Sequence, residues 1–505
     1  MARRRGRVQR RRSDTGVRQL PWREIVNPYA PIEVLSKDQV EAIHQASMRL
    51  LQEVGVRVLD GEARSLLAEA EAEVDEAAQV VRFDATLIED KVALAPSEFT
   101  LHARNPDHHV KIGGKNIVFT AVGGPAFCND LDSGRRTGTY EEQCDYLRLV
   151  QSLNIVHQEG GGPFEAMDLH PESRHLDLYL AQNRLLDKTW QPLALGRERA
   201  EDAIEMACIG LGVDRAGLAR RPALQSIINT NTPLQFDIPM AEGTIAMARA
   251  GQSVCITPFT LSGAMGPATL AGTLTLQNAE ALMGIAFTQI VNPGTPAVYG
   301  AFTSNVDMRS GSPAFGTPEY TKAAHASGQL ARRYNLPFRS SNTTASPTVD
   351  EQAVYESSMS LWGAVMAHAN LVEHAAGWIE GGLTASFEKL IIDAEMLQMM
   401  AEYLRPIEVN EDTLAFEAIQ EVGPGGHFFG SPHTMERYET AFYAPMLSDW
   451  RNYETWEETG SVATCARANG IWKKLLQEYE QPPLDPAVEE ELCAYVTKRK
   501  EEHSG

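Results

Sequence analysis

The sequence lacks any apolar run of the roughly 18 residues that a membrane-spanning helix needs. Basic residues are also scarce: 45 Lys and Arg stand against 67 Asp and Glu, which leaves a net charge of −22 over 505 residues. This charge makes the chain a poor partner for nucleic acid or an anionic membrane surface. Apolar residues still make up 43% and charged residues 22%, which is typical of a globular protein and excludes a disordered chain or a fibrous repeat.

Cysteine is rare as well. The six cysteines show no Cys-x-x-Cys or Cys-x-x-His spacing. In a chain of this size such cysteines are typical of reduced thiols, so we expect a cytoplasmic protein. The absence of these spacings argues against a compact zinc site, and we expect no metal site. A His and Glu site assembled from distant loops stays compatible with the sequence.

The first twelve residues have the opposite charge, with seven arginines in MARRRGRVQRRR. No apolar segment follows them, which excludes a signal peptide. A transit peptide is the alternative, but it is usually longer and rich in serine. We predict that residues 1–13 form a disordered basic arm that touches an acidic partner or the acidic body of the chain.

Residues 14–115 mix helix and strand signals and predict a small α+β region. Ser36 stands three residues before Gln39, the spacing of a capping box, and apolar residues follow at helical spacing through Leu51. Short apolar runs at 56–59 and 80–83 predict two strands.

Residues 116–403 alternate short apolar runs with long amphipathic runs. Eight strands are predicted, at 117–122, 154–157, 190–195, 224–229, 253–259, 296–302, 337–342 and 371–375. Helices are predicted between and after them, at 141–152, 172–187, 199–211, 236–250, 276–291, 317–335, 351–369 and 386–403. Such alternation implies parallel strands with right-handed crossovers, and eight units of this length predict a closed (β/α)8 TIM barrel, an α/β fold.

A doubly wound open sheet is the alternative, but its phosphate-binding fingerprint is missing. The chain contains neither Gly-x-Gly-x-x-Gly after a first strand nor Gly-x-x-x-x-Gly-Lys-Ser/Thr. Beyond the barrel, residues 404–505 are charged and helical in pattern, with breaks at 423–426 and 482–483. We predict that they form a helical C-terminal region packed on the barrel.

In a TIM barrel the active site lies at the carboxyl ends of the strands. The segments that follow the predicted strands are rich in Gly, Asn and Thr, and they include Glu159, Gly160, Gly161, Asn229 and Asn342. Such a rim lets a large flat ligand approach the backbone and still surrounds a small pocket. It contains no Gly-x-Ser-x-Gly turn of a serine hydrolase and lacks the dense His and carboxylate set of a metal-dependent hydrolase.

Arg309 follows the sixth predicted strand and has two interpretations. It can pair with Asp307 as a structural tie, or it can receive a substrate carboxylate as a bidentate fork. Phe302, Tyr299 and Phe259 can offer aromatic faces to a quaternary ammonium, an interaction worth roughly 0.5–2 kcal/mol per face. The alternative for these rings is ordinary barrel core, which is favoured for Tyr299 inside its strand.

Two further residues have open roles. His427, in Gly-Gly-His-Phe-Phe, is typical of a hydrogen-bonded loop, but a C-terminal segment that folds over the barrel mouth would present it to a cofactor. Glu159 either orients a substrate or pairs with a basic neighbour.

A long, ordered series of motifs resembles the trimethylamine methyltransferase family, in particular its members without pyrrolysine. The matching segments are 261–272 (LSGAMGPATLAG), 278–280 (NAE), 292–300 (NPGTPAVYG), 307–311 (DMRSG), 316–319 (GTPE), 350–353 (DEQA), 380–389 (EGGLTASFEK) and 425–430 (GGHFFG). The series spans essentially the whole chain, and its length and order make it specific where one motif would not be.

The resemblance implies an enzyme of one-carbon metabolism that moves a methyl group from a methylated amine to the cob(I)alamin of a partner corrinoid protein. No cofactor is expected to bind this chain tightly, since the corrinoid-binding motif Asp-x-His-x-x-Gly is absent. In the founding branch a pyrrolysine precedes the Asp-x-Gln-Ala segment, and its place falls at Pro347 here, within one or two residues. The missing pyrrolysine implies a quaternary amine such as glycine betaine as donor in place of trimethylamine.

This reaction needs no general acid or base, because a quaternary ammonium leaves as a neutral tertiary amine. Cob(I)alamin supplies the nucleophile, so the protein has to desolvate the cation and align its methyl group. We therefore predict that Arg309 binds the substrate carboxylate and that Phe302 and Phe259 flank its ammonium. The other predicted contacts are Asn229, Asn342 and Glu159 for the substrate and Gly160, Gly161 and His427 for the corrinoid.

Other functions stay open at this point. The donor can be trimethylamine or another methylamine, the acceptor can be tetrahydrofolate, or the barrel can bind quaternary amines without catalysis. A metal-dependent hydrolase is a more distant alternative. The expected partners are a corrinoid protein and a small methylated amine, with neither nucleic acid nor membrane, and a homo-oligomer is compatible with the sequence.

Overall fold

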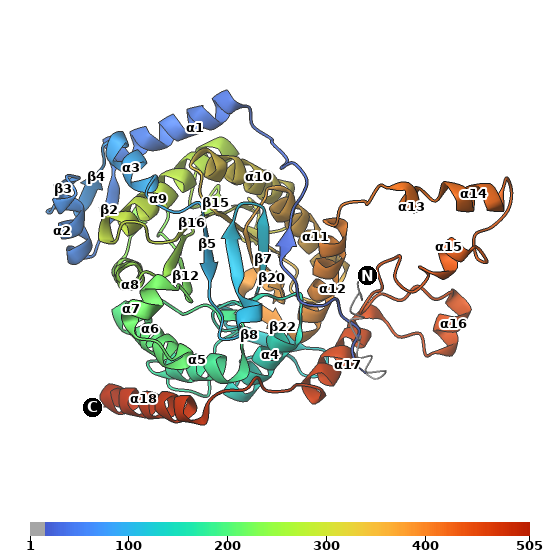
Figure 1. The fold of residues 1–505 in the computed structure, drawn as a ribbon. Helices are drawn as coiled ribbons and strands as arrows, with labels where there is room; N and C mark the ends of the chain where they lie inside the picture. Colours follow the sequence, from blue (N-terminus) through green and yellow to red (C-terminus); the bar gives the residue numbers. More distant parts are fainter. Residues whose placement is uncertain (1–15, 505) are drawn as a thin grey trace, which may run out of the picture.

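The computed structural model describes residues 16–504, so the basic arm predicted at 1–13 lies outside the described residues. At its centre the described chain forms a ring of eight parallel strands, which α-helices surround (Figure 1). The strand order is β11, β10, β7, β20, β19, β16, β14 and β12, and a parallel bridge between Trp190 and Leu224 closes the ring. The predicted (β/α)8 TIM barrel is confirmed.

The barrel elements follow one another as strand and helix. The strands are β7 (Asn116–Ala121), β10 (Gln158–Glu159), β11 (Thr189–Trp190), β12 (Gln225–Ile228), β14 (Ser253–Ile256), β16 (Ala297–Gly300), β19 (Phe338–Ser341) and β20 (Leu371–Ala376). The helices that surround them are α4 (Tyr140–Ser152), α5 (Arg174–Leu185), α6 (Arg197–Leu211), α7 (Arg215–Arg220), α8 (Ile238–Arg249), α9 (Leu270–Val291), α10 (Pro318–Arg333), α11 (Glu351–Met366) and α12 (Phe387–Tyr403). Each of the predicted helices overlaps one of these.

The second strand is the one barrel strand that misses its predicted segment, since it begins at Gln158 and the prediction ended at residue 157. The ammonium of Lys188 explains the shift. Its Nζ donates to the carbonyl oxygens of Val150, Leu153 and Val156 at 2.8, 2.8 and 2.7 Å. Two of these carbonyls lie at or beside the predicted strand and are thereby removed from a β ladder, so this segment folds as a turn under a buried cation.

Short strands extend the barrel at its carboxyl end and build the mouth. They form two small sheets, made of β15 (Phe259–Ser262), β17 (Phe302–Val306) and β18 (Pro313–Ala314), and of β8 (Phe127–Asp130), β9 (Gly134–Arg136), β21 (Trp378–Ile379) and β22 (Thr384–Ser386). The amino-terminal end is closed by a hairpin of β5 (Glu98–Leu101) and β6 (Val110–Gly113). Its Leu101, Val110 and Ile112 pack in one buried cluster with side chains from the barrel strands.

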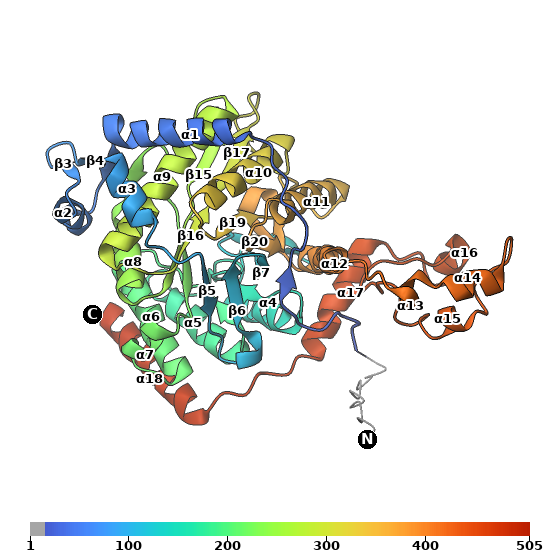
Figure 2. The same ribbon diagram turned by 45° about the horizontal axis from the view of Figure 1, so that its top comes forward.

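The N-terminal region packs beside the barrel. Helix α1 (Lys37–Arg49) starts at the predicted capping box, in which the Ser36 hydroxyl accepts from the Gln39 backbone and the Gln39 side chain caps the Ser36 N–H. A small sheet of β2 (Val56–Val58), β3 (Glu73–Asp75) and β4 (Val80–Arg82) follows, with β13 (Gln235–Phe236) added from the barrel. Helices α1 and α3 (Ala85–Val92) pack against α9, while α2 (Gly61–Glu69) lies at the outer edge (Figure 2).

The C-terminal region has two parts with different surroundings. Helix α17 (Thr464–Gln477) packs on α12, and α18 (Pro486–Ser504) packs on α5 and α6, as predicted for a region that covers the barrel. Residues 405–463 differ from the prediction. They form an arm with α13 (Glu411–Leu414), α14 (Phe416–Val422), α15 (Pro432–Met435) and α16 (Tyr453–Glu458) that projects away from the barrel (Figures 1 and 2). The arm is tied to the barrel at 443–448, where Glu395 on α12 accepts from the Tyr443 hydroxyl at 3.0 Å and Leu447 is buried.

Within residues 16–504, no helix combines the length and the apolar character needed to cross a membrane. All six cysteines are free thiols, four of them buried.

Candidate active site

A cavity of about 380 Å³ opens at the carboxyl ends of the barrel strands. The size is that of a pocket for a small molecule. Glycines form much of its wall and rim, namely Gly123, Gly124, Gly160, Gly161, Gly381 and Gly382. The wall otherwise consists of apolar and aromatic side chains with a few polar groups, and within residues 16–504 no Asp, Glu, Lys, Ser or Cys lines it.

Three aromatic rings cluster on one side of this cavity. The ring centre of Phe302 lies 5.2 Å from that of Phe259 and 6.0 Å from that of Trp378. The parallel pairing of β15 with β17 places Phe259 directly opposite Phe302. The Trp378 indole N–H donates to the Thr344 carbonyl at 3.3 Å, which fixes the plane of that ring. Exposed π faces of this kind attract cations, most strongly where water is excluded.

Arg339 brings a cation to the same cavity. It lies on β19, is 2% exposed, and its Cζ stands 5.3 Å from the centre of the Phe302 ring. One guanidinium nitrogen, Nη1, donates to the Ala301 carbonyl at 3.3 Å, and the buried Nε has no partner.

His374 contributes a neutral imidazole. An irregular register in β20 and a left-handed backbone (φ 51°) turn this residue into the cavity wall. Burial holds the pKa of its imidazole well below the usual value, and the charge of Arg339 lowers it further. The Gly123 N–H points at Nδ1 from 3.4 Å, so Nδ1 accepts and Nε2 carries the hydrogen.

Two buried carboxyl groups lie behind the cavity wall. Burial raises the pKa of Glu373 to about 7, against the opposing effect of the Arg339 charge. Its Oε1 accepts from the Gln191 side chain at 2.6 Å, and its Oε2 has no partner. Gln191 lines the cavity, so it separates Glu373 from a ligand by one side chain.

Glu159 organises the glycine wall. Its carboxylate accepts from the Gly161 and Gly162 backbone N–H groups at 2.9 and 2.7 Å and from the Gln182 side chain at 2.6 Å. Burial raises the pKa of Glu159 to about 7, although these three donors favour the charged form. Gly160 has no room for a side chain, because a Cβ there would overlap the Ala121 carbonyl.

The structure brings five of the predicted site residues to one cavity. These are Phe302, Phe259, Asn229, Gly160 and Gly161. Asn229 is held by its side-chain amide, which donates to the Thr257 carbonyl at 2.8 Å.

Five other predicted residues do not line this cavity. Glu159 and Asn342 are fully buried, and the Asn342 amide donates to the Ala375 carbonyl at 3.1 Å. Arg309 is exposed in the turn between β17 and β18, where its backbone N–H donates to Asp307. Pro347 is exposed in the loop before α11, and His427 is exposed on the arm.

The site residues that were missed are Arg339, His374 and Trp378. The sequence could have indicated Arg339, because a charged residue inside a predicted barrel strand must either face the barrel interior or break the strand. His374 and Trp378 are oriented by a strand irregularity, which no spacing in the sequence reveals.

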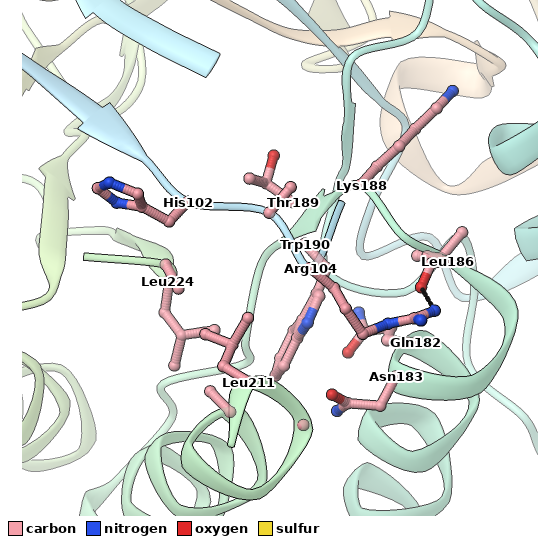
Figure 3. A pocket seen from close by; sticks show the side chains of 14 residues that line it. His102, Arg104, Gln182, Asn183, Leu186, Lys188, Thr189, Trp190, Leu211 and Leu224 are labelled. Carbon is pink, nitrogen blue, oxygen red and sulfur yellow. Dashed lines mark hydrogen bonds between the residues drawn. The ribbon is translucent and has the colours of Figure 1, made fainter. Parts of the chain in front are cut away.

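A second, much smaller cavity, shown in Figure 3, lies beside the start of β11. Its volume is about 20 Å³, enough for about one water molecule. Arg104 lines it and donates to the Leu186 carbonyl at 2.6 Å, so this cation is already engaged in holding a loop. The small cavity is therefore a packing feature.

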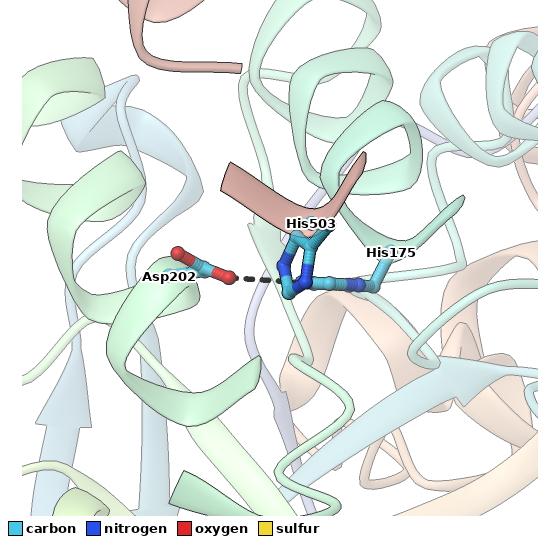
Figure 4. Close-up of side chains that lie close together, drawn as sticks. All are labelled: His175, Asp202 and His503. Carbon is cyan, nitrogen blue, oxygen red and sulfur yellow. Dashed lines mark hydrogen bonds and ion pairs between the residues drawn. The ribbon is translucent and has the colours of Figure 1, made fainter. Parts of the chain in front are cut away.

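Within residues 16–504, one group of side chains has the spacing of a metal site, namely His175, Asp202 and His503 (Figure 4). The His175 Nε2 lies 2.9 Å from an Asp202 oxygen. The other Asp202 oxygen accepts from the Arg499 guanidinium and the Tyr495 hydroxyl, both at 2.7 Å. Because Arg499 already neutralises this carboxylate, the cluster serves to fasten α18 to α5 and α6.

The closed barrel with an aromatic cavity at its carboxyl ends defines the class, a TIM-barrel protein with a small-ligand site in the strand-end loops. The model of the family described as trimethylamine methyltransferase (MTTB) matches residues 2–504. The chain belongs to this family and is a methyltransferase.

Similar proteins cover nearly all of the chain. A glycine betaine methyltransferase of Desulfitobacterium hafniense is 40% identical over 93% of this chain and 97% of its own length. The trimethylamine methyltransferase MttB2 of Methanosarcina mazei is 29% identical over 92% of this chain and 95% of its own length. The solved hydroxylamine complex of MtmB covers 91% of both chains with a TM-score of 0.54 at 12% identity, which supports the fold.

Proposed function

We propose that this enzyme transfers a methyl group from a quaternary amine to the cob(I)alamin of a separate corrinoid protein. The observation that carries the proposal is the cavity itself, because aromatic faces line it and, among the described residues, no carboxyl group, amine, thiol or serine hydroxyl does. The Thr257 hydroxyl and the His374 imidazole also line it, but the first lies 3.2 Å from the Cys255 thiol and the second faces the Gly123 N–H. A site of this kind can bind and orient a cationic methyl donor, but the nucleophile has to come from outside. The 40% identity to a glycine betaine methyltransferase supports glycine betaine as the donor.

The residues of this chain would prepare the donor for an in-line displacement. Phe302, Phe259 and Trp378 would replace the water around the ammonium and restrict its rotation. When the N–CH3 bond breaks, its electron pair stays on nitrogen and yields a neutral tertiary amine, so no proton has to be delivered. Cob(I)alamin supplies the electron pair that forms the new bond to the methyl carbon.

The rim fits a flat macrocycle. Glycines at 123–124, 160–161 and 381–382 leave stretches of backbone without side chains around the opening, so a corrin ring could approach these stretches closely and would contact the exposed Leu195 and Leu383 beside them. Gly161 and Gly162 are held in place by the Glu159 carboxyl group behind them. We place no corrinoid contact at His427, because the arm that carries it contributes nothing to the cavity wall.

The test is an assay of the purified protein with free cob(I)alamin and a panel of glycine betaine, choline, carnitine and trimethylamine. We expect the absorption spectrum of methylcobalamin to appear with a quaternary amine and not with trimethylamine. Transfer from trimethylamine alone, or from no amine in the panel, would refute the proposal.

A matched pair of variants tests the aromatic wall. Phe302→Leu should lower kcat/KM for the preferred quaternary amine about 2- to 30-fold, since one cation–π face is worth roughly 0.5–2 kcal/mol. Phe416→Leu serves as the control, because Phe416 is 71% exposed on the arm and should leave the rate unchanged. Equal effects of the two changes would contradict a role for the aromatic wall.

A further inference from the structure

Arg339 is a buried cation without an anionic partner. Among the described residues no carboxylate lies within ion-pair distance of its guanidinium, and its one hydrogen bond goes to the Ala301 carbonyl. Its Nε is buried and has no acceptor. An unpaired buried charge is costly, and proteins usually retain one only where a partner arrives. Arg339 also lines the cavity, so a ligand in the cavity is the partner within its reach.

The surroundings define which anion fits. Of the described residues, Arg339 is the single cationic group in the cavity wall, and the other polar lining groups are neutral. Glu373 lies close enough to feel the Arg339 charge, and Glu159 adds a second carboxyl group behind the wall. A doubly charged anion such as phosphate would need a second cationic group, and the described residues place none in the cavity wall. A single carboxylate matches the one guanidinium, whose fork can hold both oxygens.

We propose that Arg339 receives the carboxylate of the methyl donor and thereby makes the enzyme selective for betaines, that is, zwitterions with a quaternary ammonium and a carboxylate. The inference rests on the proposed function, and it assigns to Arg339 the carboxylate-binding role that the sequence suggested for Arg309. Arg309 lies exposed outside the cavity, whereas Arg339 stands 5.3 Å from the Phe302 ring that faces the ammonium.

The position of Arg339 also accounts for selection against donors that carry only a positive charge. Its guanidinium lies against the same aromatic cluster that would hold the ammonium, so a simple cation such as choline meets electrostatic repulsion there. A betaine brings its own carboxylate and neutralises Arg339 when it binds. The aromatic cluster is then free to attract the ammonium.

Binding of carbon analogues separates this role from methyl transfer. In 3,3-dimethylbutanoate, carbon replaces the nitrogen of glycine betaine, so the molecule keeps the carboxylate and the shape but cannot donate a methyl group. In 3,3-dimethylbutan-1-ol, a CH2OH group replaces the carboxylate. Isothermal titration calorimetry with the whole protein should show that the acid binds at least 10-fold more tightly than the alcohol. Equal affinities would overturn the proposal, whether or not methyl transfer has been observed.

The variant Arg339→Met should weaken binding of the acid about 10- to 100-fold and leave binding of the alcohol unchanged or improved. Retained binding of the alcohol reports an intact cavity in the same sample. Arg339→Lys keeps the charge and serves if the Met variant does not fold; it should bind the acid with intermediate affinity, because an ammonium cannot form the two parallel contacts. In turnover with glycine betaine, Arg339→Met should raise KM more than it lowers kcat. If Arg309→Ala weakens binding of the acid and Arg339→Met does not, the assignment is wrong.

Discussion

At the scale of single residues, the site is governed by burial of groups that are usually charged. Arg339, Glu373 and Glu159 lie in or behind one cavity, and only Glu159 is surrounded by several hydrogen-bond donors. Burial favours the neutral form of each carboxyl group and thereby couples the site to pH. The folded protein should therefore hold protons near neutral pH that the unfolded chain releases.

For Glu373, the change of the unfolding free energy with pH has a definite sign that can be measured. Its pKa is about 7 in the folded protein, compared with 4.5 for a free glutamate, so its stabilising contribution is complete below about pH 4.5 and is lost as the pH rises through 7. Relative to Glu373→Gln, which cannot titrate, the wild type should lose on the order of 3 kcal/mol of unfolding free energy between pH 5 and 8. Urea denaturation of both proteins at several pH values measures this difference. A difference that does not change with pH would show that Glu373 has an ordinary pKa.

At the scale of elements, the regular parts of the barrel could be predicted and the irregular parts could not. The alternation of β-branched runs with amphipathic runs predicts strands and helices because each period matches a buried face. The second strand was misplaced because three of its neighbouring carbonyls bind Lys188, a contact between segments that are distant in sequence. The helices of the arm project from the barrel although they were predicted to pack on it. Helical periodicity identifies a helix but does not indicate what the helix packs against.

The same limit applies to the site. The position of Phe259, Phe302 and Asn229 at the cavity could be predicted because each is the last residue of a predicted strand, and strand ends converge in a barrel. Arg309 follows a strand too, but β17 and β18 carry it past the mouth into an exposed turn. His374 and Trp378 depend on how β20 bends after Val372, which is a property of packing and not of spacing.

One buried ion pair on α12 holds the aromatic wall in place. Asp393 contacts Lys389 at 2.5 Å and also accepts from the backbone N–H of Gly377, the residue before Trp378. Asp393→Ala should destabilise the fold by about 3–5 kcal/mol, because it leaves Lys389 buried without a counter-ion. The double change Lys389→Met with Asp393→Leu should cost less, since no charge remains. Chemical denaturation measures both, and a double variant less stable than the single one would contradict this account.

At the scale of the whole molecule, the barrel and the arm differ in how much apolar surface they bury. The barrel core is continuous, whereas the arm exposes rings such as Phe429 (84%) and Phe442 (86%). A segment with few buried contacts opens locally at low free energy. The molecule therefore combines a stable barrel with a weakly held extension.

Limited proteolysis with chymotrypsin should reveal this difference. We expect the first cleavage within residues 405–463, at exposed aromatic residues, while the barrel stays intact. The two fragments should remain associated in the native protein, because α17 and α18 are packed on barrel helices. Mass spectrometry of the early fragments locates the cut. A first cleavage inside residues 116–403 would contradict the prediction.

The hairpin of β5 and β6, which closes the amino-terminal end of the barrel, affects the order in which molecules enter and leave the site during turnover. Leu101, Val110 and Ile112 seal the far end of the barrel, and the glycine rim at the other end is the doorway of the cavity. If the methyl acceptor covers that doorway, the donor has to be inside before the acceptor arrives, and the demethylated amine is trapped until the acceptor departs. In that case the small molecule enters the site first and leaves it last.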